Sequence, residues 1–126
     1  MTQHYVGTKQ IVAWPQEKDG KAGYAVKYPD GYVSWSPKDV FEAAYLPMGH
    51  VDSLPAHQQR AVGEYVQLRD KVNKITGFIG VSTFNGLPAD EQDLLVSQLA
   101  AMEVYAEILS ERVRAYWDAT TVTDSQ

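Results

Sequence analysis

Two long series of apolar residues at helical spacing limit the fold of this chain more than any other feature of its sequence. Both series repeat every three to four positions, as one face of an amphipathic helix does. The first is Ala61, Val62, Tyr65, Leu68, Val72, Ile75 and Ile79, and the second is Leu95, Leu99, Met102, Tyr105, Leu109, Val113 and Tyr116. Asp52 or Ser53 is predicted to cap the first helix, which would be about 35 Å long.

A short connection separates the two predicted helices. The connection contains Phe84-Asn85-Gly86 and ends near Pro88. The acids Asp90, Glu91 and Asp93 then favour the start of the second helix, which is predicted to continue for about 28 residues. Long helices joined this closely form an antiparallel hairpin. Leu94, Val104 and Ile108 widen the apolar face of the second helix, so we expect the N-terminal sheet and another copy of the chain to cover it.

The first half of the chain predicts strands, because five of the six prolines precede residue 56 and break any long helix. We predict strands at 8–14, 23–28 and 32–35, with residues 16–22 as a loop. Pro29-Asp30-Gly31 has the composition of a hairpin turn between the last two strands. Ser36 as N-cap and Pro37 at the first position then predict a short helix at 37–45.

These elements predict an α+β fold: a small N-terminal antiparallel β-sheet with a short helix, followed by a long antiparallel two-helix hairpin. The sheet module spans 1–48 and the helical hairpin 49–119, packed as a single domain, and 120–126 is expected to be a disordered tail. Residues 1–48 have no net charge, so the whole formal charge of −5 falls on the rest of the chain.

Composition excludes several classes of protein. The longest apolar runs are only a few residues, such as Leu94 to Val96, so no membrane span is predicted, and no signal peptide is visible. The absence of cysteine excludes disulfides and thiolate chemistry. An acidic chain is poorly suited to coat DNA or RNA, although a small anionic ligand in a local basic pocket is compatible with it. We therefore expect a cytosolic protein.

No catalytic constellation stands out. The three histidines, His4, His50 and His57, lack the spacing of a metal pair on one helix. There is no Gly-x-Ser-x-Gly elbow and no glycine-rich phosphate loop. Glu103, Glu107 and Glu111 lie one turn apart, but a solvated helix face has the same pattern. We therefore predict no enzymatic activity, no catalytic residue, no metal and no cofactor.

The scarce basic residues and the aromatic residues are the candidate ligand contacts. In an antiparallel hairpin Arg112 and Arg114 approach Arg60, while Lys74 and Thr76 lie toward the other end. Ion pairs such as Asp70 with Lys74 and Arg114 with Asp118 are the alternative explanation for these bases. Eight of the fourteen aromatic residues fall within the first 45 positions, where they could stack on a base or simply pack across strands.

Several strings of this sequence resemble small bacteriophage proteins. The N-terminal strings are Tyr5-Val6-Gly7-Thr8-Lys9, Ile11-Val12-Ala13-Trp14-Pro15, Gly23-Tyr24 and Tyr28-Pro29-Asp30-Gly31-Tyr32-Val33-Ser34-Trp35-Ser36-Pro37-Lys38-Asp39-Val40-Phe41-Glu42. The second half contains Leu54-Pro55-x-His57-Gln58-Gln59-Arg60, Phe78-Ile79, Phe84, Leu87-Pro88, Glu91-Gln92, Leu94-Leu95, Gln98, Met102, Tyr105, Leu109 and Arg112. Over about residues 4–117 the chain is similar to the first anti-Thoeris sponge family, with a helical hairpin like that of the anti-CBASS cyclic-oligonucleotide sponges.

This resemblance implies a binding role in the cytoplasm of the bacterial host. Members of the family hold a cyclic ADP-ribose signal (gcADPR) intact and so block Thoeris immunity. They form homodimers or homohexamers, and some also hold CBASS cyclic trinucleotides at separate sites. The Lys-x-Thr segment of the trinucleotide sponges corresponds to Lys74-Ile75-Thr76, and a late arginine of the second helix corresponds to Arg114 or Arg112.

A cyclic ADP-ribose isomer carries two phosphates, an adenine and ribose hydroxyls, which defines the side chains that a pocket needs. We expect Arg112 and Arg114 to contact phosphate, Phe84 or Trp35 to stack on adenine, and Asn85 to make polar contacts.

Two alternative functions remain open. One is a phage interaction protein whose acidic helices contact a host enzyme directly and inhibit it. The other is a small phosphodiesterase, which needs a metal or an acid–base pair.

Overall fold

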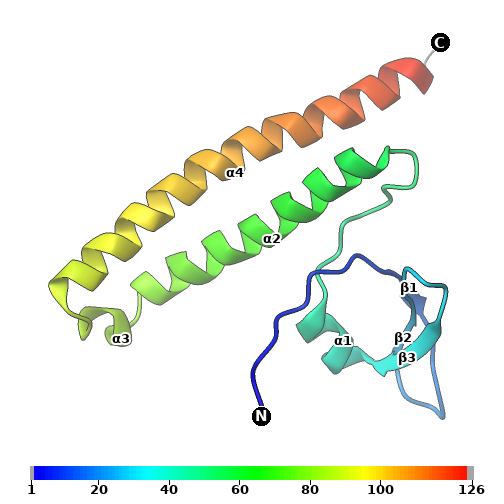
Figure 1. Cartoon of the computed structure of the whole chain (residues 1–126), viewed down its shortest axis with the longest axis horizontal. Helices are drawn as coiled ribbons and strands as arrows, with labels where there is room; N and C mark the ends of the chain where they lie inside the picture. The colour runs from blue at the N-terminus through cyan, green and yellow to red at the C-terminus, as the bar shows by residue number, and fades with distance from the viewer. Residues whose placement is uncertain (1, 125–126) are drawn as a thin grey trace. The chain divides into compact units, whose positions relative to one another are not determined.

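The computed structural model describes the backbone of residues 2–124 and the side chains of residues 2–119. The chain divides between Leu46 and Pro47 into two compact units, close to the predicted boundary after residue 48. Three antiparallel strands and a short helix form the first unit, and the long helices form the second (Figure 1). The predicted α+β fold is therefore confirmed, whereas packing of the two modules as a single domain stays a prediction.

The N-terminal sheet consists of β1 (Val12–Pro15), β2 (Gly23–Lys27) and β3 (Val33–Pro37), in that order and antiparallel throughout. β1 begins four residues later than predicted, because its pairing with β2 ends where Val12 faces Lys27. Residues 8–11 thus have β-forming composition but no partner strand in the ladder. Ala25 and Val26 of the central strand are both 2% exposed and form the buried part of the sheet.

The turn between β2 and β3 has the predicted structure. Gly31 adopts a positive φ of 92°, and its amide donates to the Tyr28 carbonyl at 2.9 Å. The Tyr28 amide donates to the Tyr32 carbonyl at 2.9 Å, and the Asp30 carboxylate accepts from the Tyr32 amide at 3.0 Å. Glycine tolerates this left-handed backbone without steric cost, which explains the Pro-Asp-Gly sequence.

The short helix α1 (Lys38–Ala44) starts one residue after the predicted position, and the prediction that Ser36 caps it is wrong. Ser36 belongs to β3, opposite Tyr24, and its hydroxyl donates to the Pro37 carbonyl. Pro37 is the N-cap, because its backbone is still extended and it has no amide hydrogen to satisfy. Tyr24 stacks on Phe41 with a centroid separation of 4.2 Å, which joins the sheet to the helix.

The helical unit is an antiparallel hairpin of α2 (Ala56–Ile79) and α4 (Ala89–Asp124), as predicted (Figure 1). The connection contains α3 (Ser82–Asn85), a single turn that the sequence pattern did not predict. The middle of the hairpin is a cluster of Leu68, Val72, Ala106 and Leu109, with Tyr65, Leu99 and Met102 packed against it. These are residues of the two predicted apolar series, apart from Ala106.

A glutamine side chain makes hydrogen bonds at the start of each long helix. Neither Asp52 nor Ser53 caps α2, so that prediction is wrong, and its N-cap is Pro55 with no side-chain hydrogen bond. Gln59 donates instead to the carbonyls of Val51 (3.1 Å) and Leu54 (2.9 Å). In the same way Gln92, four residues after Pro88, donates to the carbonyls of Asn85 (3.2 Å) and Leu87 (2.8 Å).

α4 has 36 residues, about eight more than predicted, and its backbone continues to Asp124. The helix therefore extends into the 120–126 segment that was expected to be disordered, and residues 125–126 lie outside the described part. Because α4 is 12 residues longer than α2, α2 cannot cover the apolar face of α4 along its whole length. The loop before α2 packs against one end of α4. There Val51 and Leu54 of the loop and Val62 of α2 form a second cluster with Met48, Val113, Tyr116 and Trp117.

Candidate functional site: a polar groove along the helical hairpin

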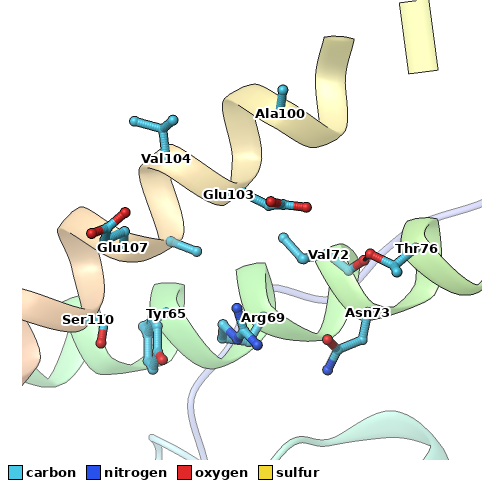
Figure 2. Close-up of a pocket in the computed structure, with 11 residues that line it drawn as sticks. Tyr65, Arg69, Val72, Asn73, Thr76, Ala100, Glu103, Val104, Glu107 and Ser110 are labelled. Atoms are coloured by element: carbon cyan, nitrogen blue, oxygen red, sulfur yellow. Dashed lines mark hydrogen bonds between the residues drawn. The ribbon is translucent and has the colours of Figure 1, made fainter. Parts of the chain in front are cut away.

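An open groove of ≈ 670 Å³ runs along one side of the hairpin, between α2 and α4 (Figure 2). Pockets for small ligands commonly have volumes of about 300–1,000 Å³, so this groove has the size of a nucleotide site. Its lining residues come only from the two long helices and are Tyr65, Arg69, Val72, Asn73, Thr76, Ala100, Glu103, Val104, Ala106, Glu107 and Ser110.

The α2 wall supplies hydrogen-bond donors. Arg69, Asn73 and Thr76 are spaced four and three residues apart, so they share one face of the helix. Thr76 donates its hydroxyl to the Val72 carbonyl at 2.8 Å, which leaves the oxygen free to accept. Arg69 is exposed, and among the side chains described here no carboxylate lies within ion-pair distance of its guanidinium.

The α4 wall supplies carboxylates. Glu103 and Glu107 lie one turn apart on α4, and Figure 2 shows both on the opposite wall from Arg69. The groove thus has one positive and two negative groups. A simple dianion would be repelled by this wall, whereas a ligand with both an anionic group and sugar hydroxyls could place its anion at Arg69 and donate hydroxyls to the glutamates.

The two predicted arginines lie on opposite sides of α4. They are two positions apart, which corresponds to about 200° around a helix, so one small ligand cannot contact both within a single chain. Arg112 donates to the Tyr116 hydroxyl at 3.0 Å. Val113 packs at the end of the hairpin where Val62 lies, which confirms that this pair of arginines approaches the start of α2.

Lys74 and Thr76 are separated in the same way. Thr76 lines the groove, while Lys74 forms the predicted ion pair with Asp70 at 2.8 Å. The other expected pair, Arg114 with Asp118, is not within ion-pair distance in the described residues. Lys74 lies 12 residues after Val62, or about 18 Å along α2, so it is far from Arg112 and Arg114.

Phe84 and Asn85 lie in α3, at the turn of the hairpin. Phe84 is only 7% exposed and packs edge-on against Phe78, with ring centroids 6.2 Å apart. Its ring is part of the apolar packing of this turn, so stacking on an adenine requires α3 to move. Asn85 is exposed, and its backbone carbonyl accepts from Gln92.

Trp35 is the predicted contact that belongs to the N-terminal unit. Its indole nitrogen donates to the Gln16 carbonyl at 2.7 Å, and the Lys18 ammonium lies 5.7 Å from the ring centroid. The ring also packs against Gly23, where a side chain would collide with it. Trp35 therefore has a structural role within its sheet, and its role in ligand binding stays a prediction.

A line of polar side chains follows the other side of the hairpin. The Tyr105 hydroxyl donates to the Glu64 carboxylate across the two helices. Arg112 lies about two turns further along α4 and donates to Tyr116. The hydrogen bond to Glu64, and to a smaller extent burial, raises the pKa of Tyr105, whereas the charge of Arg112 opposes this. These contacts connect α2 to α4 on the side away from the groove.

The sequence analysis missed Arg69, Asn73 and Ser110 as candidate contacts. A signal was present, since Arg69, Asn73 and Thr76 form a polar row beside the apolar series of α2. The row could not be recognised as a groove wall until α4 supplied the second wall. Among the described residues, no group of three or more histidine or acidic side chains could hold a metal ion. Within the same part of the chain, no helix is both long and apolar enough to cross a membrane.

Comparison with known proteins gives a family-model match and a phage relative. Residues 55–115, which run from the start of α2 through most of α4, match the family model described as Sequestin. An uncharacterized 7.5 kDa protein of Enterobacteria phage T4, from the denB–rIIB intergenic region, is 39% identical over 61 residues. That alignment covers 48% of this chain and 95% of the phage protein. No solved structure matches.

Proposed function

Because the chain belongs to the same family as this phage T4 protein and carries a Sequestin match in its hairpin, we propose that it sequesters a small signalling nucleotide without hydrolysing it. The name of the matching family supports a sequestering role. The proposed ligand is a cyclic ADP-ribose isomer (gcADPR), and the proposed consequence is that Thoeris immunity is blocked in the cytoplasm of the bacterial host. Binding of cyclic trinucleotides at separate sites and assembly as a homodimer or homohexamer belong to the same proposal.

The groove of the hairpin is the observation that carries this proposal. A cyclic ADP-ribose isomer has a diphosphate, two riboses and an adenine. Arg69 offers the phosphates a charge-assisted hydrogen bond, while Glu103 and Glu107 offer acceptors to ribose hydroxyls. Tyr65 lines the same groove and has a ring on which the base could stack. Thr76 also lines this groove, and it is the lining residue that the sequence analysis had predicted as a ligand contact.

The test is retention of the intact nucleotide. The protein is incubated with a gcADPR isomer, filtered and heat-denatured, and the released material is identified by chromatography. We expect near-stoichiometric recovery of unchanged ligand and nanomolar affinity, about −12 kcal/mol. Ligand that passes the filter would favour the alternative, an acidic protein that contacts a host enzyme directly. A fragmented product would instead indicate a phosphodiesterase.

Matched variants locate the site. Arg69→Ala should weaken binding at least about tenfold, the typical effect of losing a hydrogen bond to a charged group. Lys71→Ala removes an equally exposed base two positions along α2, where it faces away from the groove, and should change affinity less than twofold. If alanine at Arg112 and Arg114 abolishes binding while Arg69→Ala does not, the ligand lies at the end of the hairpin instead.

A further inference from the structure

The two faces of the N-terminal sheet carry different side chains. Side chains alternate between the faces along each strand, so the register assigns every strand residue to one face. Tyr24 belongs to the face that α1 covers, since its ring stacks on Phe41 and its hydroxyl donates to Glu42 at 2.8 Å. The opposite face, which we call the lysine face, carries Val12, Trp14, Ala25, Lys27, Val33 and Trp35.

The lysine face continues beyond the strands into the loop between β1 and β2. Lys18 and Lys21 exchange two backbone hydrogen bonds of 3.0 Å, on either side of a two-residue turn, Asp19-Gly20, in which both residues have positive φ. The register of β1 with β2 therefore continues unbroken to this turn, and by alternation both lysines share the face of Trp14. The position of Lys18 agrees, since its ammonium lies 5.7 Å from the centroid of the Trp35 ring.

The charges on this face have one sign. Lys18 and Lys21 lie directly opposite each other at one end, and Lys27 lies about 20 Å away along β2. All three are exposed, and none is within ion-pair distance of a carboxylate in the part of the chain that the structure describes. Glu17 belongs to the other face by alternation, so no strand position of the lysine face carries an acid. Like charges directly opposite each other destabilise a hairpin, and a bound anion would relieve this repulsion.

Trp14 places an exposed ring between the two groups of lysines. Trp14, Ala25 and Trp35 form one row across the three strands. The Trp35 ring packs against Gly23 and lies near Lys18, so it is engaged within the sheet. Trp14 is 41% exposed, and its neighbour in the row is only an alanine. The Trp14 ring therefore has accessible surface on which a planar group can stack.

We propose that the lysine face binds single-stranded nucleic acid, with phosphates at the lysines of both ends and a base stacked on Trp14. Positive charge combined with aromatic rings is the arrangement by which proteins hold single strands without reading their sequence. The ring lies between the charges, which matches the alternation of bases and phosphates along a strand, whereas a duplex would keep its bases away from the ring. Residues 1–48 have no net charge, so the formal charge of −5 does not fall on this unit.

The salt dependence of oligonucleotide binding tests the charge contacts. The probe is a fluorescein-labelled single strand of about ten thymidines, and fluorescence anisotropy measures its binding to the full chain. Three phosphate contacts predict a slope of log K against log salt of about −2, and Lys18→Ala/Lys21→Ala should reduce this slope to about −0.7. Lys38→Ala/Lys71→Ala removes two exposed lysines outside the lysine face and should keep the wild-type slope. Absence of binding to the wild type, or equal slopes for the two double variants, would overturn the proposal.

Substitution of Trp14 tests the stacking contact. Trp14→Leu keeps an apolar side chain in β1 but removes the ring, and should weaken binding of the same probe about tenfold. Trp14→Phe keeps a ring and should change the affinity by less than about threefold. Circular dichroism of both variants checks that the sheet remains folded. Equal affinities of folded Trp14→Leu and wild-type proteins would overturn the stacking contact.

Two controls separate this inference from the proposed function and from binding to a membrane. Arg69→Ala alters the groove of the helical unit and should leave oligonucleotide binding unchanged, while Lys18→Ala/Lys21→Ala should leave gcADPR binding unchanged. Loss of oligonucleotide binding in Arg69→Ala would place the nucleic acid on the hairpin and overturn the proposal. Binding to phosphatidylserine vesicles without binding to the oligonucleotide would also overturn it, in favour of a membrane surface.

Discussion

At the scale of single residues, Gly23 in the N-terminal unit packs closely against Trp35 and Ser36. A Cβ atom at this position would lie 2.3 Å from the Trp35 ring and 2.5 Å from the Ser36 carbonyl oxygen. Trp35 is held there by its hydrogen bond to Gln16, so the ring has little freedom to move aside. The packing of the sheet therefore requires a glycine at position 23, the first residue of β2.

We predict that Gly23→Ala destabilises the N-terminal unit by about 2 kcal/mol, the usual cost of overpacking a buried position. Urea unfolding followed by tryptophan fluorescence measures this change. Gly77→Ala is the control, because a Cβ there meets no atom within 4 Å and alanine is the better helix former. It should stabilise α2 by about 0.5–1 kcal/mol. An unfolding midpoint for Gly23→Ala equal to that of the wild type would contradict this description of the sheet.

At the scale of the elements, each long helix begins in the same way. A proline has its carbonyl bonded by the amide of a glutamine four residues later, at 3.0 Å in both α2 and α4. The side chain of that glutamine then satisfies two carbonyls of the preceding loop. The glutamine side chain therefore fixes the path by which the chain enters the helix. An ordinary N-cap residue works differently, because its side chain accepts hydrogen bonds from the first amides of the helix.

We predict that Gln92→Ala lowers the free energy of unfolding by about 1–2 kcal/mol, since two hydrogen bonds at the turn of the hairpin are lost. Gln98→Ala should change it by less than about 0.5 kcal/mol, because Gln98 is exposed and its side chain, within the described residues, hydrogen-bonds only to the Met102 sulfur. Thermal unfolding monitored by circular dichroism at 222 nm gives both values. Equal effects of the two substitutions would show that the hydrogen bonds of Gln92 do not stabilise the turn of the hairpin.

At the scale of the whole molecule, the helical unit leaves a large apolar face in solvent. Leu94, Val104 and Ile108 are all more than half exposed, although the sequence pattern made them part of the apolar face of α4. A two-helix hairpin has only one internal seam, so it can bury only one stripe of each helix. Assembly of several copies, which belongs to the proposed function, could bury this exposed face of α4.

Assembly as a homodimer or homohexamer, as in the proposed function, makes stability dependent on protein concentration. Because folding is then coupled to association, the wild-type Tm should rise as concentration increases, while the Tm of Val104→Glu should stay constant. Calorimetry over a hundredfold range of concentration measures this. A wild-type Tm independent of concentration would count against association.

The sequence by itself determined the three strands, the short helix α1, the two long helices and their order. Helical spacing identified α2 and α4 because one face of each must be buried, and Pro29-Asp30-Gly31 identified the hairpin because its turn requires a residue with positive φ. Tertiary structure decided how helices begin and which polar residues meet. Gln59 acts through loop carbonyls whose position depends on packing, so no local motif predicts it. Likewise, Arg69 and Glu103 are distant in sequence and become walls of one groove only when two helices pack side by side.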